Sequence, residues 1–141
     1  MADYTITAAQ VTPGSGAIYG DGIAGATITA GQSVYLDSTT NTIKLADIDS
    51  SVLTAACVGI ATHAALAGQP IRYQKAGNIV LGTSAVGIVG DIAIVGGTAG
   101  GIAPVGDLAA NDFTCILGIW NSDGKQLILS ITAPSSVVRG S

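Results

Sequence analysis

Apolar and polar residues alternate along short stretches of this chain, and glycine-rich turns separate the stretches. Ser33–Asp37 places Val34 and Leu36 on one side, and residues 126–132 alternate in the same way near their end. Alternation with a period of two is typical of strands that bury one face. A helical period of three to four occurs only briefly, around residues 46–56. The pattern predicts an all-β fold of many short strands, either a small barrel or a sandwich.

A weak internal repeat relates two parts of the chain. Gly-Gln-Ser-Val-Tyr-Leu, which begins at Gly31, resembles Gly-Asp-Ile-Ala-Ile-Val, which begins at Gly90. Val-Gly-Ile at residues 58–60 resembles Leu-Gly-Ile at residues 117–119, and both matches are 59 positions apart. Because self-similarity at a fixed spacing indicates repeated structural units, we expect two related β units.

The repeat also predicts how the chain is divided. We expect one β domain at residues 31–141, built from related units at residues 31–76 and 90–133. Asp123-Gly124 in the second unit is a strong signal for a two-residue hairpin turn. The two units are expected to pack into one compact β structure.

Residues 1–30 differ from the rest in composition. Residues 12–25 contain five glycines and one proline, so this stretch is a poor helix former and cannot build its own core. We expect an extended N-terminal arm, although an ordinary long loop after a first strand at residues 4–8 is the alternative. Adhesive side chains along the arm would let it order on a partner surface; they are Tyr4, Ile6, Ile18 and Tyr19.

The low number of charged residues indicates a subunit of an assembly and not a lone domain. Only 10% of the residues are charged, against roughly 25% in an average soluble domain, and glutamate is absent. Small monomers rely on a charged surface to stay soluble and unassociated. We therefore expect a large part of the surface to be covered by other subunits. A neutral surface rich in hydroxyl groups is the alternative.

The charge and the apolar runs of the chain argue against a nucleic-acid partner and a membrane partner. The net charge is −4 and lysine and arginine form no cluster, which argues against a nucleic-acid partner. The N-terminus has neither the basic residues nor the apolar run of a signal peptide, and no stretch has the pattern of a membrane-spanning helix. We expect a protein that is made in the cytoplasm and has no membrane partner.

The inventory of reactive residues argues against an enzyme. His63 is the only histidine, so a dyad with Cys57 is the one nucleophile–base pair available. Cys57 lies in an apolar strand pattern, however, and His63 is more simply a loop residue. The two cysteines, Cys57 and Cys115, have no metal spacing, and we interpret them as small buried apolar residues, with a disulfide as the alternative. No cofactor and no metal site is expected.

Residues 28–133 carry a pattern that is similar to a known family. The pattern is Gly-x-x-Val-Tyr-Leu-Asp, then Ile-Lys-Leu-Ala after a polar turn, Cys-Val-Gly-Ile-Ala, and Gly-Gln-Pro-Ile-Arg-Tyr followed by Ala-Gly. It resembles the capsid decoration (cement) proteins of tailed bacteriophages. The resemblance implies a β-barrel or β-tulip-like protein, most often a trimer, on the outer surface of the virion. Its partner would be the major capsid protein of an assembled, expanded head, which it would stabilise.

This resemblance gives roles to the candidate residues. The arm residues Tyr4, Ile6, Ile18 and Tyr19 would bind the capsid. Apolar side chains of the β domain would form the contacts between subunits; these are Tyr73, Ile92, Ile94 and Trp120. Two other functions stay open: a phage tail or head-fibre domain that binds a host glycan or receptor, and a small hydrolase that uses Cys57 and His63.

Overall fold

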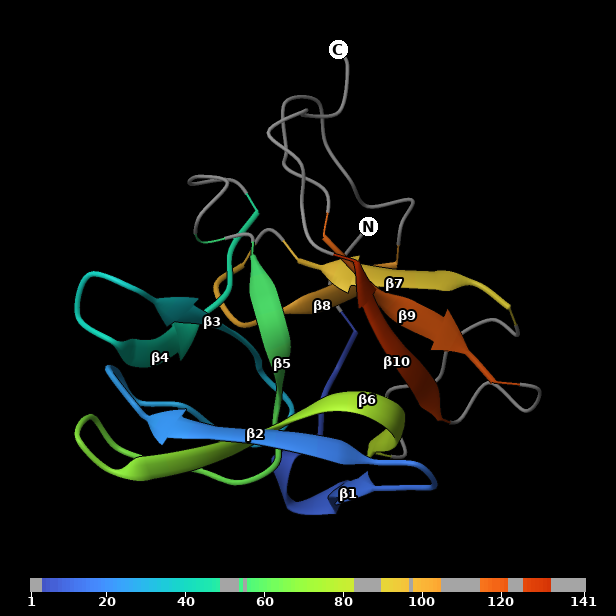
Figure 1. Ribbon diagram of the computed structural model, residues 1–141. Coiled ribbons are helices and arrows are strands. Elements are labelled where there is room, and N and C mark those ends of the chain that lie inside the picture. The colour runs from blue at the N-terminus through green and yellow to red at the C-terminus, as the bar shows by residue number, and fades with distance from the viewer. Residues whose placement is uncertain are drawn as a thin grey trace, which may run out of the picture.

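The structure is a computed structural model, shown in Figure 1, and it is almost entirely β. It describes residues 4–48, 54, 56–82, 90–96, 98–104, 115–121 and 126–132. The expected hairpin turn at Asp123-Gly124 and most of the helical pattern around residues 46–56 lie outside these ranges. The prediction of an all-β fold is confirmed.

One antiparallel sheet holds all the strands that the structure describes, and it curls into a half-barrel (Figure 1). Its order is β4-β3-β5-β6-β10-β9-β7-β8, and β1 and β2 pair with β6 beside this path. A 3-10 turn at Ala8–Gln10 precedes the first strand. The strands are β1 (Val11–Pro13), β2 (Ile18–Ile23), β3 (Ser33–Asp37), β4 (Thr42–Leu45), β5 (Cys57–Ala61), β6 (Pro70–Leu81), β7 (Ile92–Val95), β8 (Ile102–Pro104), β9 (Ile116–Trp120) and β10 (Leu127–Thr132).

The two ends of this strand order repeat each other in register. Val34 pairs with Gly59 between β3 and β5, and Ala93 pairs with Gly118 between β7 and β9. A β-bulge follows each of these pairs at the corresponding position. The residues of the second pair stand 59 positions after those of the first, which is the spacing found in the sequence. Each unit therefore has the same pairing and the same local bend.

The turns that lead into the two units also correspond. Gly31 and Gly90 both have a positive φ, at 89° and 78°, a conformation that glycine adopts without steric cost. The Gly31 N–H donates a hydrogen bond to the Ala61 carbonyl (2.8 Å), and the Gly90 N–H donates to the Trp120 carbonyl (3.1 Å). The same backbone hydrogen bond therefore closes both units, and its residues in the second unit lie 59 positions after those in the first.

Strand β6 belongs to both units because it bends at Gly77. Gly77 has φ 87°, and a Cβ there would collide with the backbone of Gly16. The strand's first part pairs with β2 and β5, and its last part pairs with β1 and β10. The buried Gln74 side chain stabilises the bend, since its Nε2 donates to the Ala76 carbonyl (3.0 Å) and the Asn78 carbonyl (2.8 Å).

The first 30 residues differ from the expected separate arm as far as the structure describes them. Strands β1 and β2 lie in this segment and both pair with β6, β2 over its full length. The backbone groups that a free arm would leave to water are thereby paired within the domain. Within residues 4–30, strands β1 and β2 are therefore a part of the sheet, and Ala24 and Ile28 add isolated bridges to it.

Two apolar clusters form the core, one for each curl of the sheet. The smaller cluster lies inside the first unit and includes Ile28, Val34 and Ile43. The larger cluster fills the second unit and extends beneath the first; it includes Trp120, Leu117 and Ile60. Burial of these side chains is the main favourable term for a fold with so few charges.

Gly118 provides a test of the paired register. A Cβ at this position would collide with the Ile128 carbonyl of β10, and at the equivalent Gly59 it would lie 2.5 Å from the Gln74 carbonyl of β6. We predict that Gly118→Ala lowers the free energy of unfolding by about 3 kcal/mol or more, because backbone must move to admit the methyl group. Urea unfolding measures the change. Ser130→Ala, at an exposed position of β10, is the control and should stay within about 0.5 kcal/mol of wild type. Equal stability of both variants would contradict the register.

Candidate interaction surface

Strand β2 carries the most prominent apolar surface of the described residues. Six large apolar side chains are exposed among the described residues. Three of them are on β2: Ile18 (55%), Tyr19 (40%) and Ile23 (45%). The others are Leu36, Leu66 and Ile119. Because contiguous exposed apolar groups often mark contact sites, β2 is the first candidate for an interaction surface.

The alternation of residues along β2 explains the exposure of Tyr19 and Ile23, whereas Ile18 lies before a register shift that separates it from Tyr19. Gly20 and Gly22 face the interior, where a Cβ would collide with the Tyr73 ring and with Ile43 respectively. Since successive side chains point to opposite faces of a strand, Tyr19, Asp21 and Ile23 face outward. The glycines thus let the inner residues of neighbouring strands fill the core under β2, and the larger side chains lie on the surface.

Arg72 of β6 fixes two of these outward side chains. Its guanidinium carbon lies 5.4 Å from the centroid of the Tyr19 ring, and its Nε donates to Asp21 Oδ1 at 2.9 Å. The ion pair is well exposed, so it contributes little to stability. Its effect is to hold the Tyr19 ring and the Asp21 carboxylate in one arrangement.

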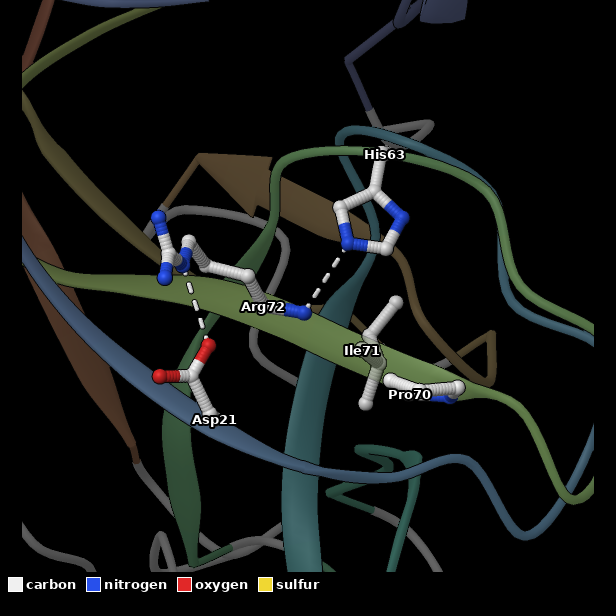
Figure 2. A pocket seen from close by; sticks show the side chains of 5 residues that line it. All are labelled: Asp21, His63, Pro70, Ile71 and Arg72. Carbon is white, nitrogen blue, oxygen red and sulfur yellow. Dashed lines mark hydrogen bonds and ion pairs between the residues drawn. The ribbon is translucent and has the colours of Figure 1, made fainter.

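His63 completes the polar side of this surface, as Figure 2 shows. Its Nε2 accepts a hydrogen bond from the Arg72 backbone N–H (3.1 Å), and its Nδ1 lies 2.9 Å from the Ala64 carbonyl. The contacts fit a neutral ring with the proton on Nδ1, which donates to the carbonyl. A shallow hollow of about 390 Å³ lies between His63, Asp21, Arg72, Ile71 and Pro70.

Cys57 and His63 have separate partners. The Cys57 thiol is buried and donates to the Gly59 carbonyl at 3.2 Å, while both ring nitrogens of the exposed His63 contact backbone groups. Burial raises the pKa of the Cys57 thiol, which disfavours a nucleophilic thiolate. The geometry gives no support to a dyad of these two residues.

The predicted capsid-binding residues divide into two groups. Ile18 and Tyr19 are exposed on β2, whereas Tyr4 and Ile6 are half-buried against the larger core cluster. Tyr4 meets Trp120 edge to face, with the ring centroids 5.2 Å apart. The Trp120 Nε1–H donates to the Tyr4 hydroxyl at 3.1 Å. Tyr4 and Ile6 therefore attach the N-terminal segment to its own domain.

Two of the predicted subunit contacts are wrong. Ile94 and Trp120 are each only 1% exposed in the single chain, so neither has surface to offer a second subunit. Both lie in the larger core cluster, where the pattern of an apolar strand could not distinguish core from interface. Tyr73 and Ile92 are half-buried and keep part of their surface accessible.

The sequence interpretation missed Asp21, Ile23 and Arg72. The signal was present in Tyr-Gly-Asp-Gly-Ile, where glycine at every second position places the other three residues on one face of a strand. The glycines indicated a flexible arm instead. Arg72 could be added only from the pairing of β2 with β6.

Other kinds of site find no support in the described part of the chain. Across the residues placed there, no cluster of three histidine, cysteine or acidic side chains could hold a metal ion. No helix formed by those residues is both long and apolar enough to cross a membrane.

Comparison with known proteins adds no relative. No protein-family model matches the chain, and a search of curated proteins finds no match. The sequence pattern and the exposed surface of β2 are therefore the features that bear on function.

The pair of Tyr4 and Trp120 tests whether the N-terminal segment is part of the domain. Trp120 is the only tryptophan, so its fluorescence reports on this one site. We predict that Tyr4→Phe costs about 1–2 kcal/mol in unfolding free energy and changes the emission, because the buried indole N–H loses its acceptor. Thr5→Ala, at the exposed neighbouring position, should change neither quantity. An unchanged emission and stability in Tyr4→Phe would contradict the contact.

Proposed function

We propose that this protein is a virion structural protein, a decoration protein that binds the outer surface of an assembled phage head and stabilises it. The observation that carries the proposal is the apolar outer face of β2, which is exposed on a chain with only 10% charged residues. A surface of this kind gains free energy when a partner covers it. The resemblance of residues 28–133 to decoration proteins points to the same role.

The backbone of β2 offers a second mode of contact. The Ala24 N–H donates to the Gln69 carbonyl, so the even-numbered residues of β2 direct their backbone groups toward β6. The backbone groups of Tyr19 and Asp21 then point to the other edge. Among the described strands β2 pairs along its length only with β6, and Ala24 just after it bridges Ile43 of β4, so an extended segment of a capsid protein could add to this edge at Tyr19 and Asp21.

A decoration protein stabilises a shell through linkage. Its binding surface on the head is complete only after assembly, so binding lowers the free energy of the intact shell relative to its parts. Many symmetric copies add their effects. We further propose a homo-oligomer, with a trimer favoured, whose subunits meet through partly exposed apolar side chains such as Tyr73 and Ile92.

A host glycan or receptor is the second candidate partner, as in a tail or head-fibre domain. The observation that favours it is the exposed Tyr19 ring beside the hydrogen-bonding groups of Asp21 and Arg72. Apolar and aromatic surface with a few fixed polar groups is typical of ligand sites. Arg72 lies over the Tyr19 ring, however, and so covers one of its faces.

Co-sedimentation with expanded heads that lack this protein tests the main proposal. We predict that replacing both Tyr19 and Ile23 by serine weakens binding by about 10-fold or more, since each loses apolar surface from the contact. Ile119→Ser is a matched control, because Ile119 and Ile23 have the same exposure of 45% but lie on different strands. Point substitutions are preferable to deletion of residues 1–20, which would remove Tyr4 and β1 from the fold.

The outcomes separate the two candidates. Wild-type binding to heads that is lost in the β2 variant and kept in Ile119→Ser supports the decoration role. The receptor-binding role is favoured if the wild-type protein does not bind heads but binds cells or a glycan array. Binding to heads that is equal in all three proteins contradicts the β2 surface.

A further inference from the structure

We propose that His63 is a proton-sensitive latch for the start of β6. In its neutral form the ring accepts the Arg72 N–H and holds that residue in place. When the ring takes up a proton, it releases the N–H and loosens the surface formed by Tyr19, Asp21 and Arg72. Such a response to pH is separate from the decoration role and does not depend on it.

The latch stands at the point where the pairing of β5 with β6 ends. The last pair is Ala61 with Tyr73, and the next pair in the same register would be Thr62 with Arg72. Half of that pair is present, because the Thr62 N–H donates to the Arg72 carbonyl (3.1 Å). In a complete pair the Arg72 N–H would donate back to the Thr62 carbonyl. Here it donates to His63 Nε2 (3.1 Å), so a side-chain nitrogen takes the place of a backbone acceptor.

His63 can accept this N–H only while its ring is neutral. Its Nδ1 lies 2.9 Å from the Ala64 carbonyl, which can only accept, so Nδ1 carries the proton and Nε2 is the acceptor. In a protonated ring both nitrogens are donors. The Nε2–H would then face the Arg72 N–H, and two donors form no hydrogen bond with each other. Proton uptake by His63 and its contact with the Arg72 backbone therefore exclude each other.

The positive charge that forms on the ring also acts on the ion pair beside it. Asp21 of β2 and Arg72 of β6 are the charged side chains among the described residues that line the hollow with His63 (Figure 2). No charged residue occurs between His63 and Arg72 in the sequence. An imidazolium repels the guanidinium and attracts the carboxylate that the guanidinium holds at 2.9 Å. Protonation of His63 therefore weakens this ion pair.

The ion pair connects the latch to the outer face of β2. The Arg72 guanidinium carbon lies 5.4 Å from the centroid of the exposed Tyr19 ring, so a shift of Arg72 reaches that ring. Imidazole changes its charge in the range of about pH 5 to 8. The surface is thus fixed at the upper end of this range and looser at the lower end, and a partner bound at β2 would be held differently in the two states.

Nuclear magnetic resonance of the isolated protein tests the latch, since His63 is the only histidine and its ring signals are unambiguous. The ring nitrogens, the Arg72 amide and the Arg72 Nε–H are followed from about pH 8 to about pH 5. We expect both Arg72 signals to move in step with protonation of the ring. Hydrogen exchange, corrected for its intrinsic dependence on pH, should show the Arg72 amide about 10-fold less protected at the lower pH. The Gly14 amide, which donates to the Asn78 carbonyl, should keep its protection.

His63→Gln is the matched control, because an amide oxygen accepts an N–H at every pH and takes up no proton. This variant should keep the Arg72 amide protected at the lower pH, whereas His63→Ala should lose the protection at both ends of the range. Arg72 signals and protection that stay constant while the ring titrates would overturn the proposal. A fall in protection that His63→Gln shares would overturn it as well, since another titrating group would then be the cause. No phage head enters this experiment, so its failure is distinguishable from a failure of the decoration role.

Discussion

The bend of β6 at Gly77 is the constraint on which the other parts of this structure depend. This strand of twelve residues pairs with β5 at Tyr73 and Gln74 and with β10 from Ala76 to Ile79, so it joins the two units within one sheet. Two features leave no place for a side chain at the bend: Gly77 has φ 87°, and the backbone of Gly16 lies where a Cβ would be. Gln74 Nε2 donates to the carbonyls of Ala76 and Asn78 at the bend, while its buried Oε1 has no partner among the described residues. The two units can therefore curl separately while they share this strand, and the larger apolar cluster extends from the second unit beneath the first.

The sequence pattern predicted the class of the fold because strand alternation is a local property. The repeat spacing is also visible in the sequence, because Gly59 and Gly118 occur at equivalent positions. At each of them a carbonyl of the adjacent strand leaves no room for a Cβ. Sequence could not show which apolar residues are core and which are surface. Trp120 and Ile23 are both apolar strand residues, yet one is 1% exposed and the other 45%. That difference arises from pairings between segments that lie far apart in the chain.

The glycines of the N-terminal segment have a structural role that composition alone does not show. Glycine-rich segments resist helix formation and lack a core of their own, so residues 12–25 indicated a mobile arm. In the sheet, Gly20 and Gly22 serve a different purpose, because they admit the Tyr73 ring and Ile43 beneath β2.

The repeat also accounts for the free edge of β2. The last part of β6 has the place in the second unit that β2 has in the first. Asn78 of β6 pairs with Ile128 of β10 in the second unit, and Tyr19 of β2 pairs with Gln74 of β6 in the first. That part of β6 is covered on its other edge by β1, which pairs Val11 with Leu81.

Among the described strands no counterpart of β1 pairs along β2; β4 reaches only its end, where Ala24 bridges Ile43, so the edge at Tyr19 and Asp21 has no paired strand beside it. Open edges are templates for pairing with another chain, and proteins usually protect them. Strands β4 and β8 end the strand order and are edge strands as well, but β2 is the strand whose unpaired part lies beside exposed apolar side chains, those of Tyr19 and Ile23. In the proposed decoration role, backbone pairing and apolar contact could therefore occur together at β2.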